Sequence, residues 1–257
     1  MTSERPWLYL ILGSHASGRR EVLADLIQAG LTADDRAAVI LPDGESATPA
    51  DAALPVAARW TLEGELARVE LPAEATHVFL LLNGRENPVD QIEALAAWLP
   101  NAACELARVL CVVDCTLAEK HADLLAWYDA CIHFSDVVLL GRREGVANKW
   151  MSDFRRRYAE QRMPCLFEMI KAGRVKNPAL LLDPEARRLS HVFDADDWAG
   201  ISLHDVEIGT GDGEEDGEAL SAEELDPDDM PEVDPYFERK PGGYRVRTLP
   251  QITRFLD

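Results

Sequence analysis

Short apolar runs alternate with amphipathic segments between residue 7 and residue 167. The runs have the length of strands and stay apolar at successive positions, which is typical of strands covered on both faces of a parallel sheet. They fall at residues 7–12, 37–41, 77–82, 108–113, 136–140 and 164–167. Residues 57–62 and 66–71 are expected to form two short strands, or a strand and a turn. Segments with helical periodicity fall at 20–29, 88–98, 116–128 and 147–161. This order predicts an α/β fold with a mostly parallel, doubly wound sheet.

The negative charge of the chain is concentrated near its C-terminus. The formal net charge is −20, and fifteen Asp and Glu but no Lys or Arg lie between Asp205 and Glu238. Outside that stretch the chain carries 26 basic and 31 acidic residues. The stretch is rich in glycine and nearly free of aromatics, which is typical of a disordered linker. The sequence predicts an α/β domain at 1–202, an acidic linker at 203–234 and a C-terminal docking tail at 235–257.

Composition also limits which cellular compartment and which binding partners we expect for the chain. The acidic balance argues against nucleic acid or an anionic membrane as the main partner. The apolar run at 7–12 is too short for a signal-peptide core or a membrane span. The five cysteines are odd in number and contain no CxxC pair, which indicates reduced thiols rather than a disulfide framework. We expect a soluble, cytoplasmic protein.

The first apolar run ends in a glycine-containing turn that leads into a helix. Gly13 and Gly18 have the spacing G-x-x-x-x-G, which is the spacing of the phosphate-binding P-loop. Such a loop binds phosphate because its backbone N–H groups point inward and the helix N-terminus adds its dipole. The predicted nucleotide-binding residues of the loop are Gly13, Ser14, His15, Ala16, Ser17, Gly18, Arg19 and Arg20.

Two positions of this loop depart from the P-loop pattern. Arg19 stands where the motif has a lysine that contacts phosphate, and Arg20 stands where it has a Ser or Thr that binds Mg²⁺. Arginine remains cationic but presents a larger, planar head, and it does not bind Mg²⁺. Because Mg²⁺ is not bound, we expect weaker charge neutralisation during phosphoryl transfer. An ordinary strand–turn–helix in which the glycines only shape the turn remains the alternative.

Asp114 is the remaining candidate for the binding site. It follows the run at 108–113, at the carboxyl edge of the expected sheet, where α/β proteins bind ligands. The alternative role is to cap the helix that begins near residue 116. The six histidines show no metal-binding spacing and no G-x-S-x-G follows a strand, so we assign neither metal ligands nor catalytic residues.

Three segments together resemble one family, the CobW-like P-loop GTPases linked to metal delivery and cobalamin synthesis. The first is the loop at 13–20. The second, at 77–95, is similar to the family's strand and switch region and keeps Gly84 and Pro88 in position. The third, at 108–146, is similar to the family's strand ending in an Asp, here Asp114, with a helix and a further strand after it. Weaker likenesses at 59–71 and 173–183 extend the resemblance over residues 7–183.

The resemblance implies a fold of the P-loop NTPase type, but the family's chemical positions differ here. Leu82 and Asn83 replace the switch Glu and Thr, and residues 141–144 replace the guanine-reading Asn-Lys-x-Asp. The metal-binding cysteines of the family are absent. The resemblance therefore implies a degenerate member, or pseudo-GTPase, whose ligand is GTP, ATP or another phosphate compound, with Mg²⁺ disfavoured.

A basic stripe offers a surface for a protein partner. Its members lie on and before the helix expected at 147–161: Arg142, Arg143, Lys149, Arg155, Arg156, Arg157 and Arg162. The basic stripe faces the acidic linker, a neighbouring subunit or solvent, and the sequence leaves these three alternatives open. The C-terminal tail is a second candidate for partner binding.

Three functions remain open from the sequence. The first is a degenerate GTPase that binds nucleotide weakly or not at all and acts as a binding or regulatory module. The second is an atypical, active GTPase or ATPase involved in metal homeostasis. The third is a structural interaction protein without nucleotide.

Overall fold

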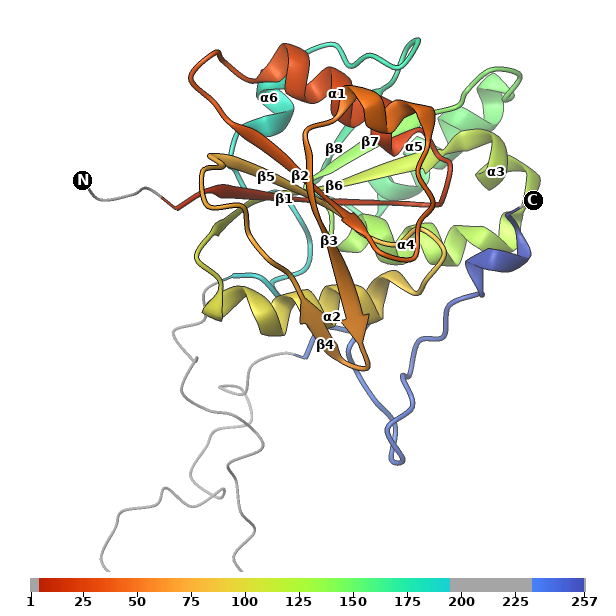
Figure 1. Ribbon diagram of the computed structural model, residues 1–257. Helices are drawn as coiled ribbons and strands as arrows, with labels where there is room; N and C mark the ends of the chain where they lie inside the picture. Colours follow the sequence, from red (N-terminus) through yellow and green to blue (C-terminus); the bar gives the residue numbers. More distant parts are fainter. Residues whose placement is uncertain (1–4, 195–232, 257) are drawn as a thin grey trace, which may run out of the picture.

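A single mixed sheet forms the centre of the fold (Figure 1). The computed structural model describes residues 5–194 and 233–256. The strands are β1 (Trp7–Gly13), β2 (Ala37–Pro42), β3 (Val56–Glu63), β4 (Leu66–Arg68), β5 (His77–Leu81), β6 (Glu105–Asp114), β7 (Val137–Gly141) and β8 (Leu166–Met169). Their order is β4-β3-β2-β5-β1-β6-β7-β8, and only β3 and β4 pair antiparallel. The predicted doubly wound, mostly parallel sheet is confirmed.

Helices cover both faces of this sheet. The helices are α1 (Arg19–Gly30), α2 (Pro88–Trp98), α3 (Cys115–Lys120), α4 (Leu125–His133), α5 (Asn148–Glu160) and α6 (Pro178–Leu182). Short 3₁₀ helices are η1 (Pro49–Ala53), η2 (Leu99–Asn101), η3 (Ala122–Leu124) and η5 (Ile252–Arg254). Apolar residues of α1 and α6 pack on one face, and those of α2, α4 and α5 pack on the other. The two faces therefore have separate cores.

The strand β1 shows why continuous apolar runs indicate a sheet covered on both sides. Leu8, Leu10 and Leu12 belong to the core beneath α2 and α4, while Tyr9 and Ile11 belong to the core beneath α1. Because successive side chains of a strand point to opposite faces, both sets must be apolar when both faces are buried. All five are at most 2% exposed. This burial fixes β1 in the middle of the sheet, between β5 and β6.

The helix expected at 116–128 is divided. The helix α3 ends at Lys120, and His121 adopts φ −129° and ψ 89°, outside the helical region. The chain then makes the 3₁₀ turn η3 before α4 begins at Leu125. This break lets Trp127 and Tyr128 enter the core, where both are at most 1% exposed. The expected strand at 66–71 is also shorter, since β4 ends at Arg68.

Residues 233–256 lie against the helices α2 and α4. Tyr236 and Ile252 are buried in the same core as these helices. Arg245 donates to Asp90 of α2 at 2.7 Å and also pairs with Glu93. His133 of α4 lies 2.8 Å from a carboxylate oxygen of Asp234. The C-terminal segment is thus held by apolar burial and by ion pairs on one face of the domain.

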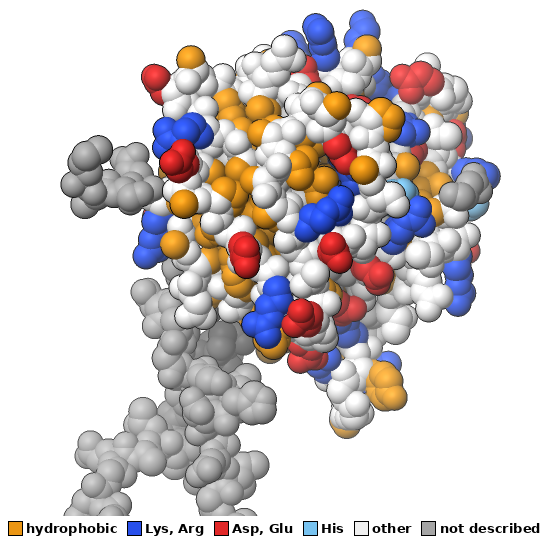
Figure 2. Space-filling view, in the orientation of Figure 1, with side chains coloured by type: hydrophobic (Ala, Val, Ile, Leu, Met, Phe, Trp, Pro, Cys, Tyr) orange, Lys and Arg blue, Asp and Glu red, His pale blue; other side chains and the backbone are white. Residues whose placement is uncertain are grey.

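The expected acidic linker lies outside the described residues, apart from Val233 and Asp234. In the part of the chain that the structure describes, no helix combines the length and apolar character needed to cross a bilayer. On the face shown in Figure 2, basic and acidic side chains are interspersed rather than gathered by sign. The basic stripe is likewise partly paired, because Arg157 contacts Asp129 and Arg156 lies 2.6 Å from Asp153.

Candidate functional site: an arginine–glutamate cluster at the glycine loop

The glycine loop joins β1 to α1 at the carboxyl edge of the sheet. At Gly13, φ is +134°, and an added Cβ would lie 2.4 Å from the carbonyl oxygen of Val112 on β6. Only glycine combines this backbone conformation with so close an approach to a neighbouring strand. The loop follows β1, which lies between the parallel strands β5 and β6. Doubly wound folds bind ligands at such a switch point, at the carboxyl edge of the sheet.

The backbone of the loop is tied to its surroundings. The N–H of His15 donates to the carbonyl of Gly84 at 2.9 Å, and the N–H of Ser17 donates to the carbonyl of Ser14 at 3.2 Å. An added Cβ at Gly84 would lie 2.3 Å from the backbone nitrogen of His15, so this glycine is required by close packing. Two loop N–H groups are thus already engaged within the protein.

Arg19 is buried and makes its contacts inside the protein. Its side chain is 3% exposed. One guanidinium nitrogen donates to the carbonyl of Leu82 at 2.5 Å, and the other donates to Oε1 of Glu45 at 2.5 Å. The residue that replaces the phosphate-contacting lysine therefore already has a carboxylate as its partner.

Arg20 is held in the same way. Its Nη1 donates to both carboxylate oxygens of Asp51, at 2.7 and 2.8 Å, and to the carbonyl of Ser46 at 3.0 Å. Its Nη2 donates to Oε2 of Glu45 at 3.1 Å. Thr48 and Asp51 form a capping box at the start of η1, and this capping box holds the carboxylate of Asp51 in place. We refer to Arg19, Arg20, Glu45 and Asp51 as the arginine–glutamate cluster.

Glu45 is the centre of this cluster. It is 3% exposed and also accepts from the backbone N–H of Gly84 at 2.8 Å. Burial alone would raise the pKa of Glu45, but the charge of Arg19 and the hydrogen bonds from Gly84 and Arg19 outweigh it and hold that pKa below its usual value. The buried carboxylate is therefore ionised at neutral pH.

His15 lies at the edge of the cluster. Its Nδ1 is 3.7 Å from Oε1 of Glu45 and has no hydrogen-bond partner among the described residues. Burial lowers the pKa of His15, and the charges of Arg85 and Arg19 add to that effect while Glu45 opposes it. The imidazole is therefore neutral at neutral pH and adds no cation to the loop.

The two loop serines have different surroundings. The hydroxyl of Ser14 lies 3.0 Å from the Tyr128 hydroxyl, which in turn accepts from the backbone N–H of Asp114 at 3.2 Å. Ser17 is 1% exposed, and its hydroxyl has no partner among the residues that the structure describes. Tyr128 thus links the loop to the end of β6.

Asp114 caps α3. Its Oδ1 accepts from the N–H of Leu117 at 2.9 Å, and Arg142 approaches its Oδ2 at 3.6 Å. Burial raises the pKa of Asp114, although the hydrogen bond from Leu117 and the charge of Arg142 oppose that effect. The capping role raised by the sequence is present in the structure, and contact of Asp114 with a nucleotide stays a prediction.

Two hollows adjoin the loop, and they differ in volume and in the residues that line them. One of about 110 Å³ lies beside His15, Gly18 and the arginine–glutamate cluster. The second, of about 210 Å³, is lined by Ser17, Arg142 and Glu144, among others. Among the described residues, no group of three or more His, Cys, Asp or Glu is placed to hold a metal ion.

The cluster does not fit a magnesium triphosphate. Arg20 occupies the position from which a hydroxyl would bind Mg²⁺. Both guanidinium groups have carboxylate partners, so a phosphate would compete with Glu45 for its donors. Carboxylates of the protein itself hold both arginines in place.

The sequence placed the loop but not its partners. The eight loop residues are consecutive and lie together beside the end of β6, which carries Asp114. Glu45 and Asp51 were not among the candidates, because they lie in a Pro-, Asp- and Gly-containing stretch expected to be an ordinary loop. No periodicity or motif connects them with residues that are more than twenty positions earlier in the chain.

Comparison with known proteins gives structural likeness alone. No protein-family model matches the sequence, and the search of curated proteins gives no match. A Zn(II)-bound YjiA GTPase from E. coli is similar with 13% identity and a TM-score of 0.42, over 71% of this chain and 66% of that one. A YjiA triple mutant, also Zn(II)-bound, gives 14% identity, the same TM-score of 0.42 and the same coverage. The chain thus spans slightly less than two thirds of the YjiA chains.

A third similar structure is the cell division protein FtsY from Thermotoga maritima. The identity is 12% and the TM-score 0.42, over 76% of this chain and 70% of that one. The class of this protein is defined by the central β1, the glycine loop and α1 within a mostly parallel sheet. It is an α/β protein with a mostly parallel, doubly wound sheet.

Proposed function

We propose that this chain is a degenerate, CobW-like P-loop protein, a pseudo-GTPase. It binds a nucleotide or phosphate ligand weakly or not at all and acts as a binding or regulatory module. The observation that carries this proposal is the buried carboxylate of Glu45, which lies 2.5 Å from a nitrogen of Arg19 and 3.1 Å from one of Arg20. The two guanidinium groups that could contact a phosphate are already paired with an internal anion.

The energetic argument concerns what a phosphate must displace. Glu45 and Arg19 are each at most 3% exposed on their side chains. Separating a buried ion pair leaves an uncompensated charge, which costs about 3–5 kcal/mol. Such a penalty lowers affinity by roughly two to three orders of magnitude or more. The internal pair therefore opposes nucleotide binding unless Glu45 finds another partner.

The loss of the magnesium position supports the same proposal. In a P-loop NTPase the metal ion neutralises charge that develops on the transferring phosphoryl group. Here Arg20 holds that position and is fixed by Asp51 at 2.7 Å. A cation is present, but it is bound to protein carboxylates and is not free to bridge two phosphates.

One observation favours the active alternative, an atypical GTPase or ATPase. The hollow of about 210 Å³ beside Gly18 and Glu144 remains next to the loop. Glu144 stands where the guanine-reading Asn-Lys-x-Asp of the CobW-like family has its Asp. A nucleoside in this hollow would place its phosphates towards the cluster, and turnover would then depend on displacement of Glu45.

Equilibrium binding and turnover of GTP and ATP, with and without Mg²⁺, test the proposal on the full chain. The proposal predicts at most weak binding, with no effect of Mg²⁺ and no hydrolysis above background. Tight, Mg²⁺-dependent binding with steady turnover would overturn it in favour of the active enzyme. A nucleotide that copurifies in stoichiometric amount would also contradict it.

A further inference from the structure

A hollow of about 510 Å³ lies where the C-terminal segment meets α4 and the turn before α2. Its walls are residues 85–87, Trp127 of α4 and residues 249–253. No residue of the glycine loop is among them, so this hollow is separate from the arginine–glutamate cluster. Its volume is in the range of sites that bind small molecules.

Trp127 brings to this hollow a polar group without a partner. The side chain is 1% exposed, and its Nε1 has no hydrogen-bond partner among the described residues. The indole nitrogen can only donate, and a buried donor without an acceptor is unfavourable because it has lost its hydrogen bonds to water. Folded proteins leave few such groups unpaired. An acceptor placed in the hollow would supply the missing partner.

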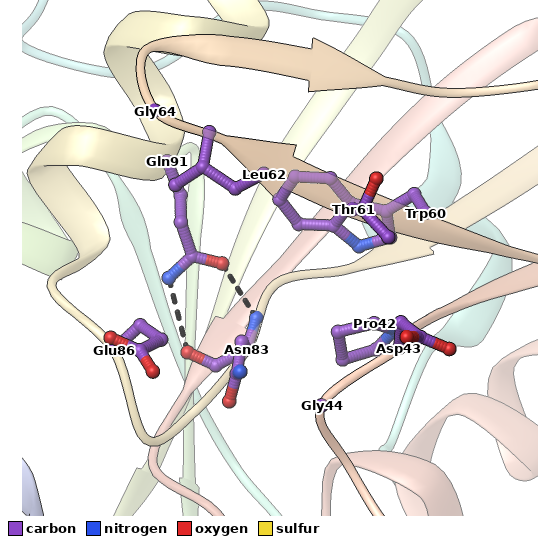
Figure 3. A pocket seen from close by; sticks show the side chains of 10 residues that line it. All are labelled: Pro42, Asp43, Gly44, Trp60, Thr61, Leu62, Gly64, Asn83, Glu86 and Gln91. Atoms are coloured by element: carbon purple, nitrogen blue, oxygen red, sulfur yellow. Dashed lines mark hydrogen bonds between the residues drawn. The ribbon is translucent and has the colours of Figure 1, made fainter.

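The hollow drawn in Figure 3, of about 390 Å³, differs in this respect. There the indole N–H of Trp60 donates to the carbonyl of Leu81 at 2.7 Å. The amide of Gln91 accepts from the N–H of Asn83 at 2.6 Å and donates to its carbonyl at 3.1 Å, as the dashed lines show. The buried polar groups of that wall have protein partners, and the indole of Trp127 has none among the described residues.

Arg85 supplies a cation to the hollow that Trp127 lines. The residue is half-buried, and its backbone N–H donates to the side-chain oxygen of Asn83 at 3.0 Å. Within residues 5–194 and 233–256, its guanidinium forms no salt bridge. A guanidinium binds a carboxylate through two parallel hydrogen bonds. The other charged residue of the lining, Glu86, is exposed, so solvent and salt screen its charge.

The C-terminal segment supplies an apolar wall. Ile252 is 2% exposed and belongs to the same core as Trp127, and Pro250 is half-buried beside it in the chain. The 3₁₀ helix η5 begins at Ile252, so the wall is part of regular structure. Apolar groups of a ligand that pack on this wall would be removed from water, which favours binding.

We propose that this hollow binds a carboxylate carried on an apolar body. The carboxylate pairs with the guanidinium of Arg85, and the indole N–H of Trp127 donates to an oxygen of the same ligand. The apolar body lies against Pro250 and Ile252. A singly charged carboxylate suits a lining that also contains Glu86 better than a doubly charged phosphate, because like charges repel.

Titration of the full chain with N-acetylleucine tests the site, followed by the ¹⁵N–¹H resonance of the Trp127 indole. The chain has six tryptophans, and Trp127→Phe identifies this resonance by its loss. We expect a saturable shift of the indole proton to higher frequency, because its N–H gains an acceptor. N-acetylleucinamide, which has the same shape without the charge, is expected to bind at least fivefold more weakly.

Arg85→Gln removes the cation and is expected to weaken binding of N-acetylleucine at least fivefold. The matched control is Arg174→Gln, which removes the same charge from an exposed position between β8 and α6 and is expected to leave the affinity unchanged. No saturable indole shift at millimolar N-acetylleucine would overturn the site. Equal weakening by the two variants, or equal binding of the amide, would do so too.

A further arm separates two sources of the carboxylate. Acetyl-Ala-Ala-Leu with a free C-terminus binds at least as tightly as N-acetylleucine if the ligand is the C-terminus of a partner chain. Weaker binding of this peptide indicates a small acid, and both results support the site. These titrations contain no nucleotide, so their outcome is independent of the proposed function at the glycine loop.

Discussion

Glu45 and Arg19 form an ion pair with 2.5 Å between Oε1 and Nη2, and both side chains are at most 3% exposed. The pair joins the end of β2 to the start of α1 and brings Gly84 and Arg20 into the same cluster. A buried carboxylate held by two guanidinium groups and one backbone N–H has the partners that a bound phosphate would have. All of these partners are supplied by the protein itself.

The stability of the fold is expected to depend on this pair. Glu45→Gln removes the charge and leaves two buried guanidinium groups with less compensation, a loss of about 3–5 kcal/mol. For a domain of this size the melting temperature would fall by roughly 6–20 °C. Thermal unfolding followed by circular dichroism measures this, with Glu21→Gln as the control. A shift no larger than that of Glu21→Gln would contradict the role of the pair.

The same pair predicts a pH dependence. The pKa of Glu45 is below its usual value in the folded chain. The contribution of its ionised carboxylate to the free energy of unfolding is therefore full above the unfolded pKa, and it is lost as the pH falls through the folded pKa. We expect the free energy of unfolding to decrease more steeply with acidification in the native chain than in Glu45→Gln, below about pH 4.5. Denaturant unfolding at a series of pH values measures the slopes, and parallel slopes would refute the assignment.

The glycine loop itself is expected to tolerate little change at Gly13. Gly13→Ala places a Cβ 2.4 Å from the Val112 carbonyl oxygen, with φ at +134°. Backbone strain of about 1–2 kcal/mol adds to an overpacking cost of about 1–3 kcal/mol. Gly145→Ala is the control, since its φ is +86° but nothing lies within 4 Å of the added atom. Equal destabilisation by the two changes would show that β6 does not press on the loop.

The C-terminal segment is expected to be held by Asp234. Its carboxylate accepts from Ser190 at 2.6 Å and contacts His133 at 2.8 Å. Burial alone would raise the pKa of Asp234, but hydrogen bonds from His133 and Ser190 lower it overall. Asp234→Asn should therefore loosen the segment and speed amide exchange at Tyr236 and Ile252. The exposed Glu238→Gln is the control, and unchanged exchange in Asp234→Asn would argue against this anchor.

The sequence predicted the elements whose pattern is local. The strand β1, the turn after it and α1 follow from one apolar run, two glycines and one amphipathic segment. The break at His121 was missed because residues 116–128 keep a helical pattern on both sides of it. The break accompanies the burial of Trp127 and Tyr128, which depends on tertiary packing.

The arginine–glutamate cluster could not be predicted from the sequence, because it also depends on tertiary structure. The two arginines were recognised as departures from a motif, but their partners depend on where the loop after β2 folds. Glu45 and Asp51 reach α1 only because β2 lies two strands away from β1 in the sheet, with β5 between them. Without that strand order, one acidic residue in a loop is indistinguishable from another.

Glu45 pairs with the guanidinium groups of both loop arginines, and a bound phosphate would compete for them. The most direct measurement is the affinity for GTP of Glu45→Gln relative to the native chain, by titration calorimetry, with Glu21→Gln as a control that removes a carboxylate from the same hollow. We expect Glu45→Gln to bind GTP at least tenfold more tightly than the native chain and Glu21→Gln to bind it no more tightly. Equal affinity of the native chain and Glu45→Gln, with both folded, would contradict it.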